Sequence, residues 1–333
     1  RDAQESRGLG DVYKRQLGFS FDIRDTFAVP DIARNAEMMN EAWQRSQYAC
    51  DVDGIVSVDP VFIQKMVEIN GNVTLEDGTV LTGKNTAEYM LNTIYKEVPV
   101  SLQDTYFEYI ASTIMNNAFS NMDITKMMKV AQSIGELTKN RHFYAYTFHD
   151  DEAKYFQGAG LAKGTPDSET DPEVGIYLNE QNPSKLGWYI DRKAQITKTG
   201  QNADGSKTYH VTYTLTNTLT SSEMATCTGY ILGGEQAGVT GKPVAAPGTS
   251  AQRMLFYAPK GGSISEITSS GDVRDQSNAV MDDQKLVTNV AYIAPGESVT
   301  FDFDITTSPK AESDLTIDQT PSGKVTNEVN YQY

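Results

Sequence analysis

Hydrophobic residues recur with two different spacings along the chain, and the change in spacing divides the sequence. In the first half, short apolar runs alternate with segments whose apolar residues recur every three or four positions, which is typical of strands alternating with helices. Later, apolar and polar residues alternate one by one, as in residues 209–216 and 301–305. We therefore predict a mixed α/β domain over residues 17–170, followed by an all-β sandwich domain over residues 171–333.

Capping residues mark where the first helices begin. Asp31 follows Pro30 and is placed to cap a helix. The apolar run 54–58 predicts a buried strand, and Asp59 with Pro60 supplies the cap and the first turn of a second helix, which is predicted to end at Gly71. The inward face of the first helix is predicted to hold Ile32, Met39, Ala42 and Trp43.

A hairpin and three helices are predicted next. Asp77 and Gly78 form the turn of the hairpin, and helices are predicted to begin near Asn85, Ser101 and Asp123. Residues 142–149 then predict another buried strand. In the third helix, apolar residues at three- and four-residue intervals predict a face in the core, formed by Ile124, Met127, Met128, Ala131, Ile134 and Leu137.

Composition indicates a globular protein and argues against one class of partner. The chain has 333 residues, of which 39% are hydrophobic and 22% are charged. The 44 acidic and 28 basic residues give a formal net charge of −16. A body this acidic repels phosphate backbones, and the sequence contains no basic run to offset that field, so we expect no nucleic-acid partner.

The first sixteen residues differ in character from the rest of the chain. Residues 1–16 resemble adapter-derived sequence, and we expect them to be a non-native leader. No stretch approaches the ~18 apolar residues that a membrane span needs. We expect that an N-terminal membrane anchor is missing from this sequence, so that the chain is the extracytoplasmic part of an envelope protein.

Several patterns that could carry chemistry have a simpler explanation. Residues 78–85 approach a phosphate-binding loop, but Asn85 stands where that loop needs Ser or Thr, and a hairpin is favoured. Four alternating acids could ligate calcium, but Pro172 occupies the position of the required glycine, and a solvated linker is favoured. These four acids are Asp167, Glu169, Asp171 and Glu173.

The histidines, the cysteines and one further acidic cluster give no convergent site. His142 and His149 are seven residues apart on one predicted strand, so they face opposite ways and cannot share a metal ion. Cys50 and Cys227 match no zinc pattern; we interpret them as small buried side chains, with a bridge between the domains left open. An acidic rim around the first buried strand is a weak candidate for catalysis and consists of Asp51, Asp53 and Asp59.

The combination of several short tracts resembles an uncharacterised bacterial family, domain of unknown function 4012. The resemblance covers nearly everything from residue 17 onward and implies a single-span envelope protein, of a kind frequent in actinobacteria and often encoded near polysaccharide genes. It implies no reaction. The tracts are residues 53–60 and 71–78, Arg24-Asp25, Gln103-Asp104, Arg141-His142-Phe143, residues 174–177 and residues 184–186.

A fainter resemblance is to LytR-CpsA-Psr enzymes, which transfer glycopolymers from polyprenyl pyrophosphate. Arg24-Asp25-Thr26 is similar to their Arg-Asp-Thr tract, which implies that Arg24 clamps pyrophosphate and that Asp25 holds Mg²⁺. Where those enzymes carry an Arg-x-Arg pair and then Arg-Gln, this chain has Tyr95-Lys96 and Gln103-Asp104. A lone lysine is a poor substitute for paired guanidinium groups on a pyrophosphate, and a surface ion pair is the simpler role for Arg24 and Asp25.

We therefore expect an extracytoplasmic envelope protein whose α/β domain binds a cell-wall glycan or a lipid-linked sugar, with the sandwich as a spacer or adhesive surface. The plentiful tyrosines, 18 in all, could stack on sugar rings. One alternative is a LytR-CpsA-Psr-like transferase with Arg24 and Asp25 in a magnesium-pyrophosphate cleft. Another is a purely structural or adhesive module. We expect no resident cofactor, with Mg²⁺ required only by the transferase.

Overall fold

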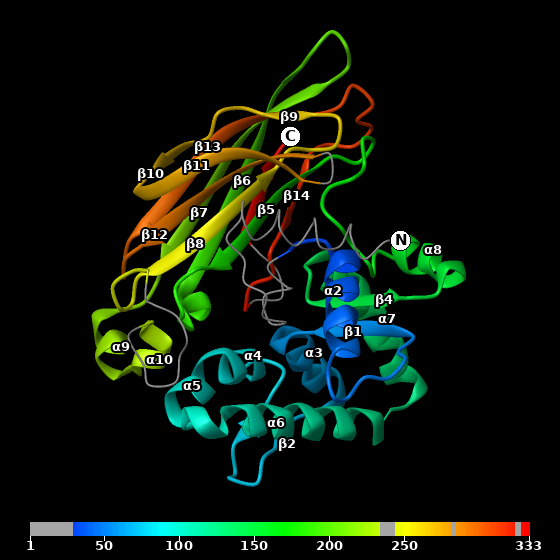
Figure 1. Cartoon of the computed structure of the whole chain (residues 1–333), viewed down its shortest axis with the longest axis vertical. Coiled ribbons are helices and arrows are strands. Elements are labelled where there is room, and N and C mark those ends of the chain that lie inside the picture. Colours follow the sequence, from blue (N-terminus) through cyan, green and yellow to red (C-terminus); the bar gives the residue numbers. More distant parts are fainter. Residues whose placement is uncertain (1–28, 121, 234–243, 282–283, 324–327) are drawn as a thin grey trace.

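A computed structural model describes residues 29–120, 122–233, 244–281, 284–323 and 328–333. Figure 1 shows most of the helices gathered at one end of the molecule and two large sheets at the other. The structure is thus a mixed α/β fold with several β-sheets, as the hydrophobic spacing predicts at that level. The boundaries predicted at residues 16 and 170 stay predictions.

The helical end is built around a short antiparallel pair of strands, β1 (Gly54–Val58) and β4 (Phe143–Thr147). A small hairpin joins β2 (Val73–Thr74) to β3 (Val80–Leu81). The π-helical turn η2 (Tyr89–Thr93) links α4 and α5. The helices are α2 (Ile32–Gln44), α3 (Pro60–Asn70), α4 (Thr86–Glu88), α5 (Ile94–Glu97), α6 (Val100–Ser120), α7 (Ile124–Lys139) and α8 (Asp150–Gly158).

The caps predicted from the sequence form as expected. The Asp59 carboxylate accepts from the backbone amides of Val61 and Phe62, both at 2.9 Å, and Pro60 occupies the first turn of α3. Asp31 caps α2 in the same way. Each carboxylate satisfies amides that have no partner within the helix, so these residues fix where the helices begin.

The two large sheets contain most of the later strands. The five-stranded sheet has the order β11-β12-β8-β5-β14, and the six-stranded sheet has the order β10-β13-β7-β6-β15, with β9 also on β13. The bounds are β5 (Glu173–Glu180), β6 (Ile190–Gln201), β7 (Lys207–Asn217), β8 (Ser250–Tyr257), β9 (Ser263–Ile264), β10 (Thr268–Ser270), β11 (Asp272–Met281), β12 (Gln284–Ile293), β13 (Ser298–Thr306), β14 (Thr316–Gln319) and β15 (Glu328–Gln332).

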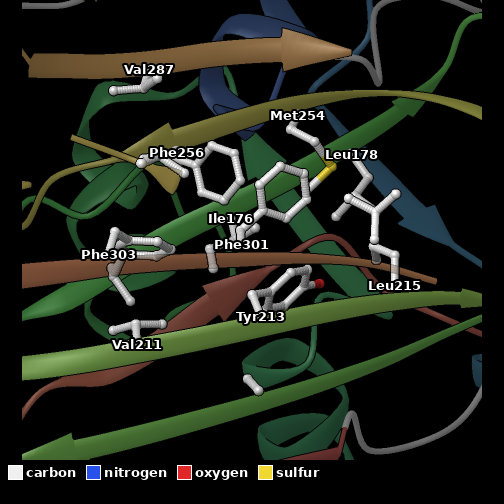
Figure 2. Close-up of a cluster of buried hydrophobic side chains, with 14 of the residues drawn as sticks. Ile176, Leu178, Val211, Tyr213, Leu215, Met254, Phe256, Val287, Phe301 and Phe303 are labelled. Atoms are coloured by element: carbon white, nitrogen blue, oxygen red, sulfur yellow. The ribbon is translucent and has the colours of Figure 1, made fainter. Parts of the chain in front are cut away.

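Alternate residues of both sheets meet in one buried core, shown in Figure 2. The Phe256 ring, from the five-stranded sheet, lies edge-on to Phe301 and Phe303 of the six-stranded sheet, at 5.1 and 5.6 Å between ring centroids. Edge-to-face aromatic pairs stabilise beyond their buried area. Short helical elements follow two of these strands, namely η3 (Leu186–Tyr189), α9 (Ser221–Thr226) and α10 (Gly229–Leu232).

The structure corrects three predictions of burial. Strand β1 forms where expected but is not buried, since Val56 is 65% exposed. The predicted core face of α7 is only partly buried, since Leu137 is 2% exposed as expected whereas Ile124, Met127 and Met128 are all 59% exposed or more. The helix packs against the helical core through Val130 and Leu137. In α2 the buried residues are Ile32, Asn35 and Ala36, and Trp43 is exposed.

The two cysteines are unpaired, and neither is fully buried. Cys50 is exposed, contrary to the prediction of a buried side chain. Cys227 is half-buried, with its sulfur 3.6 Å from the Tyr189 hydroxyl oxygen. The two thiols form no bridge in this structure.

Candidate functional site

A buried ion pair joins the helical end to the sheets. Arg141 follows α7 and has a left-handed backbone, with φ of 63°, which is uncommon for a non-glycine residue. Its Nε donates to Asp318 Oδ1 at 2.7 Å, and one Nη donates to Asp318 Oδ2. Both residues are at most 3% exposed. Such a bidentate pair is a strong, directional contact.

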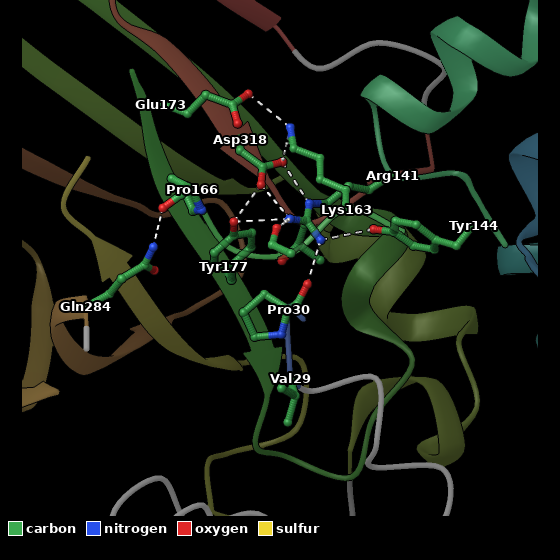
Figure 3. A network of polar contacts seen from close by, with 12 residues as sticks. Val29, Pro30, Arg141, Tyr144, Lys163, Pro166, Glu173, Tyr177, Gln284 and Asp318 are labelled. Atoms are coloured by element: carbon green, nitrogen blue, oxygen red, sulfur yellow. Dashed lines mark hydrogen bonds and ion pairs between the residues drawn. The ribbon is translucent and has the colours of Figure 1, made fainter. Parts of the chain in front are cut away.

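The remaining donors of Arg141 are also occupied, as Figure 3 shows. The other contacts are to the carbonyls of Pro30 and Gly164 and to the hydroxyls of Tyr144 and Tyr177. All three guanidinium nitrogens donate, and Asp318 balances the charge. Arg141 therefore has no donor left for an anionic ligand.

Lys163 and Glu173 extend this network. The Lys163 ammonium lies 2.9 Å from a Glu173 oxygen and 3.3 Å from an Asp318 oxygen. Burial raises the pKa of Glu173, and the nearby Asp318 carboxylate adds to that effect. Burial alone would also raise the pKa of Asp318, but Arg141 reverses this and leaves that pKa below its usual value. The network is thus held together by Arg141 and Lys163.

A cavity of about 190 Å³ adjoins this network where the two ends of the molecule meet. We call it the interface cavity. Its walls come from the start of α2, from β4 and from the sheet strands, and they combine aliphatic side chains with polar ones. The lining residues are Val29, Pro30, Ile32, Asn35, Arg141, Tyr144, Tyr177, Leu178, Asn179, Thr320 and Pro321.

A larger groove, about 1150 Å³ in volume, lies between the margins of the two large sheets. We call it the inter-sheet groove. Figure 1 shows β10 and β11 at the same edge of the sheets, and the chain crosses from one sheet to the other at Gly271. The groove is lined by residues 264–267, by residues 276–280 of β11 and by residues 285–288 of β12.

A β-bulge shapes one wall of the inter-sheet groove. The pairing of β11 with β12 shifts between Arg274 and Ser277, and Asp275 has a φ of 57°. This irregularity places the Gln276 amide against the opposite wall, where its nitrogen donates to the Ile267 carbonyl at 3.2 Å. Bulges of this kind redirect side chains and recur next to binding sites.

Two buried polar side chains of β12 lie at this wall. The Asn289 nitrogen donates to the Gln276 side-chain oxygen at 3.3 Å, but the Asn289 oxygen accepts nothing from the described residues. Thr288 lines the groove and is 2% exposed, and its hydroxyl likewise has no partner among the described residues. An unmet buried polar group costs free energy unless a ligand or water supplies its partner.

The groove combines neutral polar groups with apolar ones. Amide and hydroxyl side chains come from Ser265, Gln276, Ser277, Asn278 and Thr288, beside aliphatic residues such as Ile264, Ile267 and Leu286. Glu266 and Lys285 are the ionisable residues in the lining and balance each other in charge. Such a surface can form many uncharged hydrogen bonds and also contact apolar ligand faces.

The candidate site residues that we predicted from the sequence do not form one site among the described residues. Arg24 and Asp25, the candidates for catalysis and for Mg²⁺, lie outside the described residues. Asp53 contacts His149 at 3.0 Å, whereas the Asp59 carboxylate contacts His142 at 2.7 Å as well as capping α3. The two histidines thus have different aspartates as partners, at opposite ends of the β1–β4 pair.

The acidic linker does not converge either. Glu169 contacts Lys310 and Ser308, while Glu173 contacts Lys163. Within the described part of the chain, no three acidic, histidine or cysteine side chains are grouped so as to hold a metal ion. The helices of that part are each too short or too polar to cross a membrane.

The sequence analysis assigned no binding role to the residues of the interface cavity or of the inter-sheet groove, although Arg141 and Tyr177 lie in tracts of the family resemblance. One signal was present in β12, where Thr288 and Asn289 interrupt a run that is otherwise apolar on both faces. Adjacent polar residues in such a strand need partners inside the protein or in a ligand. The interface cavity gave no comparable local signal, since its walls come from segments far apart in the sequence.

Comparison with known protein families gives a match over part of the chain. Residues 5–95 match the model of the family described as "Protein of unknown function (DUF4012)", which confirms the resemblance over that range. Its extension to the tracts beyond residue 95 stays a prediction. No curated protein matches the chain.

Among solved structures, one that is similar comes from Legionella pneumophila subsp. pneumophila strain Philadelphia 1 and is called a "putative nutrient binding protein". The sequence identity is 13%, and the TM-score is 0.21. The similarity covers 42% of this chain and 44% of the other, so it spans less than half the length of that protein. A likeness at this level supports no conclusion about the fold or the function.

Proposed function

We propose that this protein is a non-catalytic glycan-binding protein of the bacterial cell envelope, and that it holds a neutral oligosaccharide segment in the inter-sheet groove. The sequence led us to expect the glycan in the α/β domain, with the β-rich part as a spacer. The proposal instead assigns binding to the two facing sheets, which we interpret as a β-sandwich module.

The chemistry of the groove supports a sugar ligand. A sugar ring presents hydroxyls at its edge and C–H groups on its faces, so it needs hydrogen-bonding and apolar contacts in close alternation. The groove offers both, with Gln276 and Asn278 beside Ile267 and Leu286. A lipid tail would leave the amides unpaired, and a phosphate would meet no excess of positive charge.

The size of the groove supports an oligomer. Sites for drug-sized ligands enclose roughly 300–1,000 Å³, whereas this groove encloses about 1150 Å³. It lies along β11 and β12 and opens to solvent, since Gln276 and Asn278 are both exposed. A linear chain of several sugar rings fits such a site better than one small molecule does.

Thr288 is the single observation that carries the proposal. Its hydroxyl is buried beneath the groove and has no hydrogen-bond partner among the described residues. A threonine that served packing alone would be better replaced by valine, because burying an unpaired hydroxyl is unfavourable. We infer that a ligand hydroxyl, directly or through one ordered water, completes its hydrogen bonding.

Isothermal titration calorimetry tests the proposal. The whole chain is titrated with a neutral N-acetylglucosamine tetrasaccharide, a mannan oligosaccharide and a galactan oligosaccharide. We expect one of them to bind, and Thr288→Val to weaken that binding by about tenfold, the value of one lost hydrogen bond. Thr138→Val is the matched control, because Thr138 also has a buried hydroxyl without a described partner but lies outside the groove.

Two results would contradict the proposal. One is that none of the three oligosaccharides binds the native chain at millimolar concentration. The other is that an oligosaccharide binds, yet Thr288→Val and Thr138→Val affect its affinity equally. Either result would favour a structural or adhesive module without a glycan site in the groove.

The envelope location and the transferase alternative are separate questions. The location rests on the family resemblance, and we propose an N-terminal membrane anchor for the native protein. The LytR-CpsA-Psr-like transferase depends on Arg24 and Asp25, which lie outside the described residues. Incubation with a polyprenyl-pyrophosphate-linked glycan and Mg²⁺, with Arg24→Ala as control, would detect transfer if it occurs.

A further inference from the structure

The interface cavity contains a buried acceptor that no described residue satisfies. Asn35 is 3% exposed, and its amide nitrogen donates to the Val29 carbonyl at 2.8 Å. Its side-chain oxygen is buried and has no donor among the described residues. Asn35 lines the cavity and its nitrogen is already engaged, so this oxygen is an acceptor that a ligand in the cavity could satisfy.

The same cavity offers a hydrogen-bond donor. The Tyr144 hydroxyl oxygen accepts from Arg141 at 3.2 Å, and its own hydrogen has no acceptor among the described residues. Burial raises the pKa of Tyr144 to about 12, so the hydroxyl keeps its hydrogen at neutral pH. The Tyr177 hydroxyl differs, because it already donates to Asp318 at 2.6 Å.

The neighbouring charges exclude an ionic ligand. Arg141 is the cationic residue in the cavity lining, and its donors are all engaged by carbonyls, hydroxyls and Asp318. An anion would therefore bring an uncompensated charge into a buried space, which is costly. Half of the other lining residues are aliphatic, including Ile32, Leu178 and Pro321.

The volume of the interface cavity is larger than a single water molecule needs. One water needs ~10–15 Å³ of such space, and the interface cavity has about 190 Å³. A ligand that fills this cavity must place apolar carbon atoms against Leu178 and Ile32 and polar groups next to Asn35 and Tyr144. A hydroxyl group can donate to the one and accept from the other at the same time.

From these contacts we propose that the interface cavity binds a small uncharged polyol or a single sugar ring, with a ligand hydroxyl donating to Asn35 Oδ1 and accepting from the Tyr144 hydroxyl. The walls belong to both ends of the molecule, since Asn35 and Tyr144 line the cavity together with Tyr177 and Thr320. A bound ligand would therefore also stabilise the junction between the helices and the sheets. This site is separate from the inter-sheet groove and does not depend on a glycan binding there.

Thermal unfolding and calorimetry of the whole chain test this site with glycerol, myo-inositol and D-glucose as probes and inorganic phosphate as the anionic comparison. We expect at least one neutral probe to raise the melting temperature by a few degrees at saturation, and phosphate to leave it unchanged. Tyr144→Phe should weaken binding of that probe by about tenfold, because the ring stays and only the hydroxyl is lost.

Tyr189→Phe is the matched control, since Tyr189 is 3% exposed and donates to Asn92 at 3.0 Å but does not line the cavity. It should bind the probe as the native chain does. Failure of all three neutral probes, or equal affinities for Tyr144→Phe and Tyr189→Phe, would overturn the proposal. Thr288→Val should leave binding of these probes intact, which separates this site from the inter-sheet groove.

Discussion

Arg141 and Asp318 form a bidentate buried ion pair although 177 positions separate them in the sequence. Arg141 comes from the turn after α7, and Asp318 comes from β14 at the edge of the five-stranded sheet. The contact therefore ties the helical end to the sheets. Because both charges are removed from water, each is tolerable only while the other is present.

Removal of one partner of the Arg141–Asp318 pair should strongly destabilise the protein. We expect Asp318→Asn to lower the free energy of unfolding by about 3–5 kcal/mol, because it leaves the Arg141 charge buried without compensation. Urea unfolding followed by circular dichroism measures the change. Asp272→Asn, at an exposed pair with Arg274, is the control and should show no detectable effect. A loss no larger than the control's would mean that the buried pair does not hold the two ends together.

The pair should also behave as one unit. We expect Arg141→Met combined with Asp318→Leu to cost clearly less than the sum of the two single changes, since the double variant buries no charge. A double-mutant cycle in urea measures this coupling. Additive losses would show instead that Arg141 acts mainly through its contacts with Pro30, Gly164 and the tyrosines.

His149 should titrate above an ordinary histidine. Its hydrogen bond to Asp53 raises its pKa, with Glu152 and Asp151 adding to the effect. The raised pKa means that this contact stabilises the fold below the unfolded pKa of about 6.5 and that the contribution is lost as pH rises through the folded pKa. NMR titration should show the His149 pKa falling in Asp53→Asn but not in Asp51→Asn. Equal titration in both variants would contradict the assignment.

Two glycines should respond oppositely to alanine. Gly135 lies inside α7 with no atom within 4 Å of an added Cβ, so Gly135→Ala should stabilise by up to about 1 kcal/mol. At Gly83 an added Cβ would lie 2.6 Å from Glu68 Cβ and 2.8 Å from Glu68 Cα, so Gly83→Ala should destabilise by about 1–3 kcal/mol. Thermal melts of both variants measure this, and changes of the same sign would be evidence against these packing environments.

The outward face of α7 gives a further prediction. Met128 is 59% exposed, so Met128→Gln should change the free energy of unfolding by less than about 0.5 kcal/mol. Leu137 is 2% exposed and packs against the helical core, so Leu137→Ala should cost about 2–5 kcal/mol. Denaturant titration distinguishes the two. A large loss at Met128 would restore the core face that the sequence predicts.

Local chemistry explains what the sequence could predict. The caps at Asp31 and Asp59 depend on neighbouring residues alone, and the helices begin there as expected. Burial was harder, because the three- and four-residue spacing puts Met127, Met128 and Leu137 on one predicted face but does not say how much of that face another element covers. Likewise, β1 is apolar on both sides, but it belongs to a two-stranded sheet in which Val56 stays exposed to solvent.

The inter-sheet groove and the interface cavity could not be predicted, for different reasons. The inter-sheet groove arises where the loop at Ile267 meets the bulge at Gln276, and these segments, although close in sequence, belong to different sheets. The interface cavity brings Asn35 and Thr320 into one lining. No pattern in a window of sequence reports on residues separated so widely.

The position of β14 in the chain sets an order of assembly. This strand pairs in parallel with β5, the first strand of its sheet, yet it is translated after every other member. A nascent polypeptide that has emerged only as far as β13 already contains Arg141 but lacks Asp318, its bidentate partner. The ion pair that joins the helical end to the sheets can therefore form only after β14, which carries Asp318, has been synthesised.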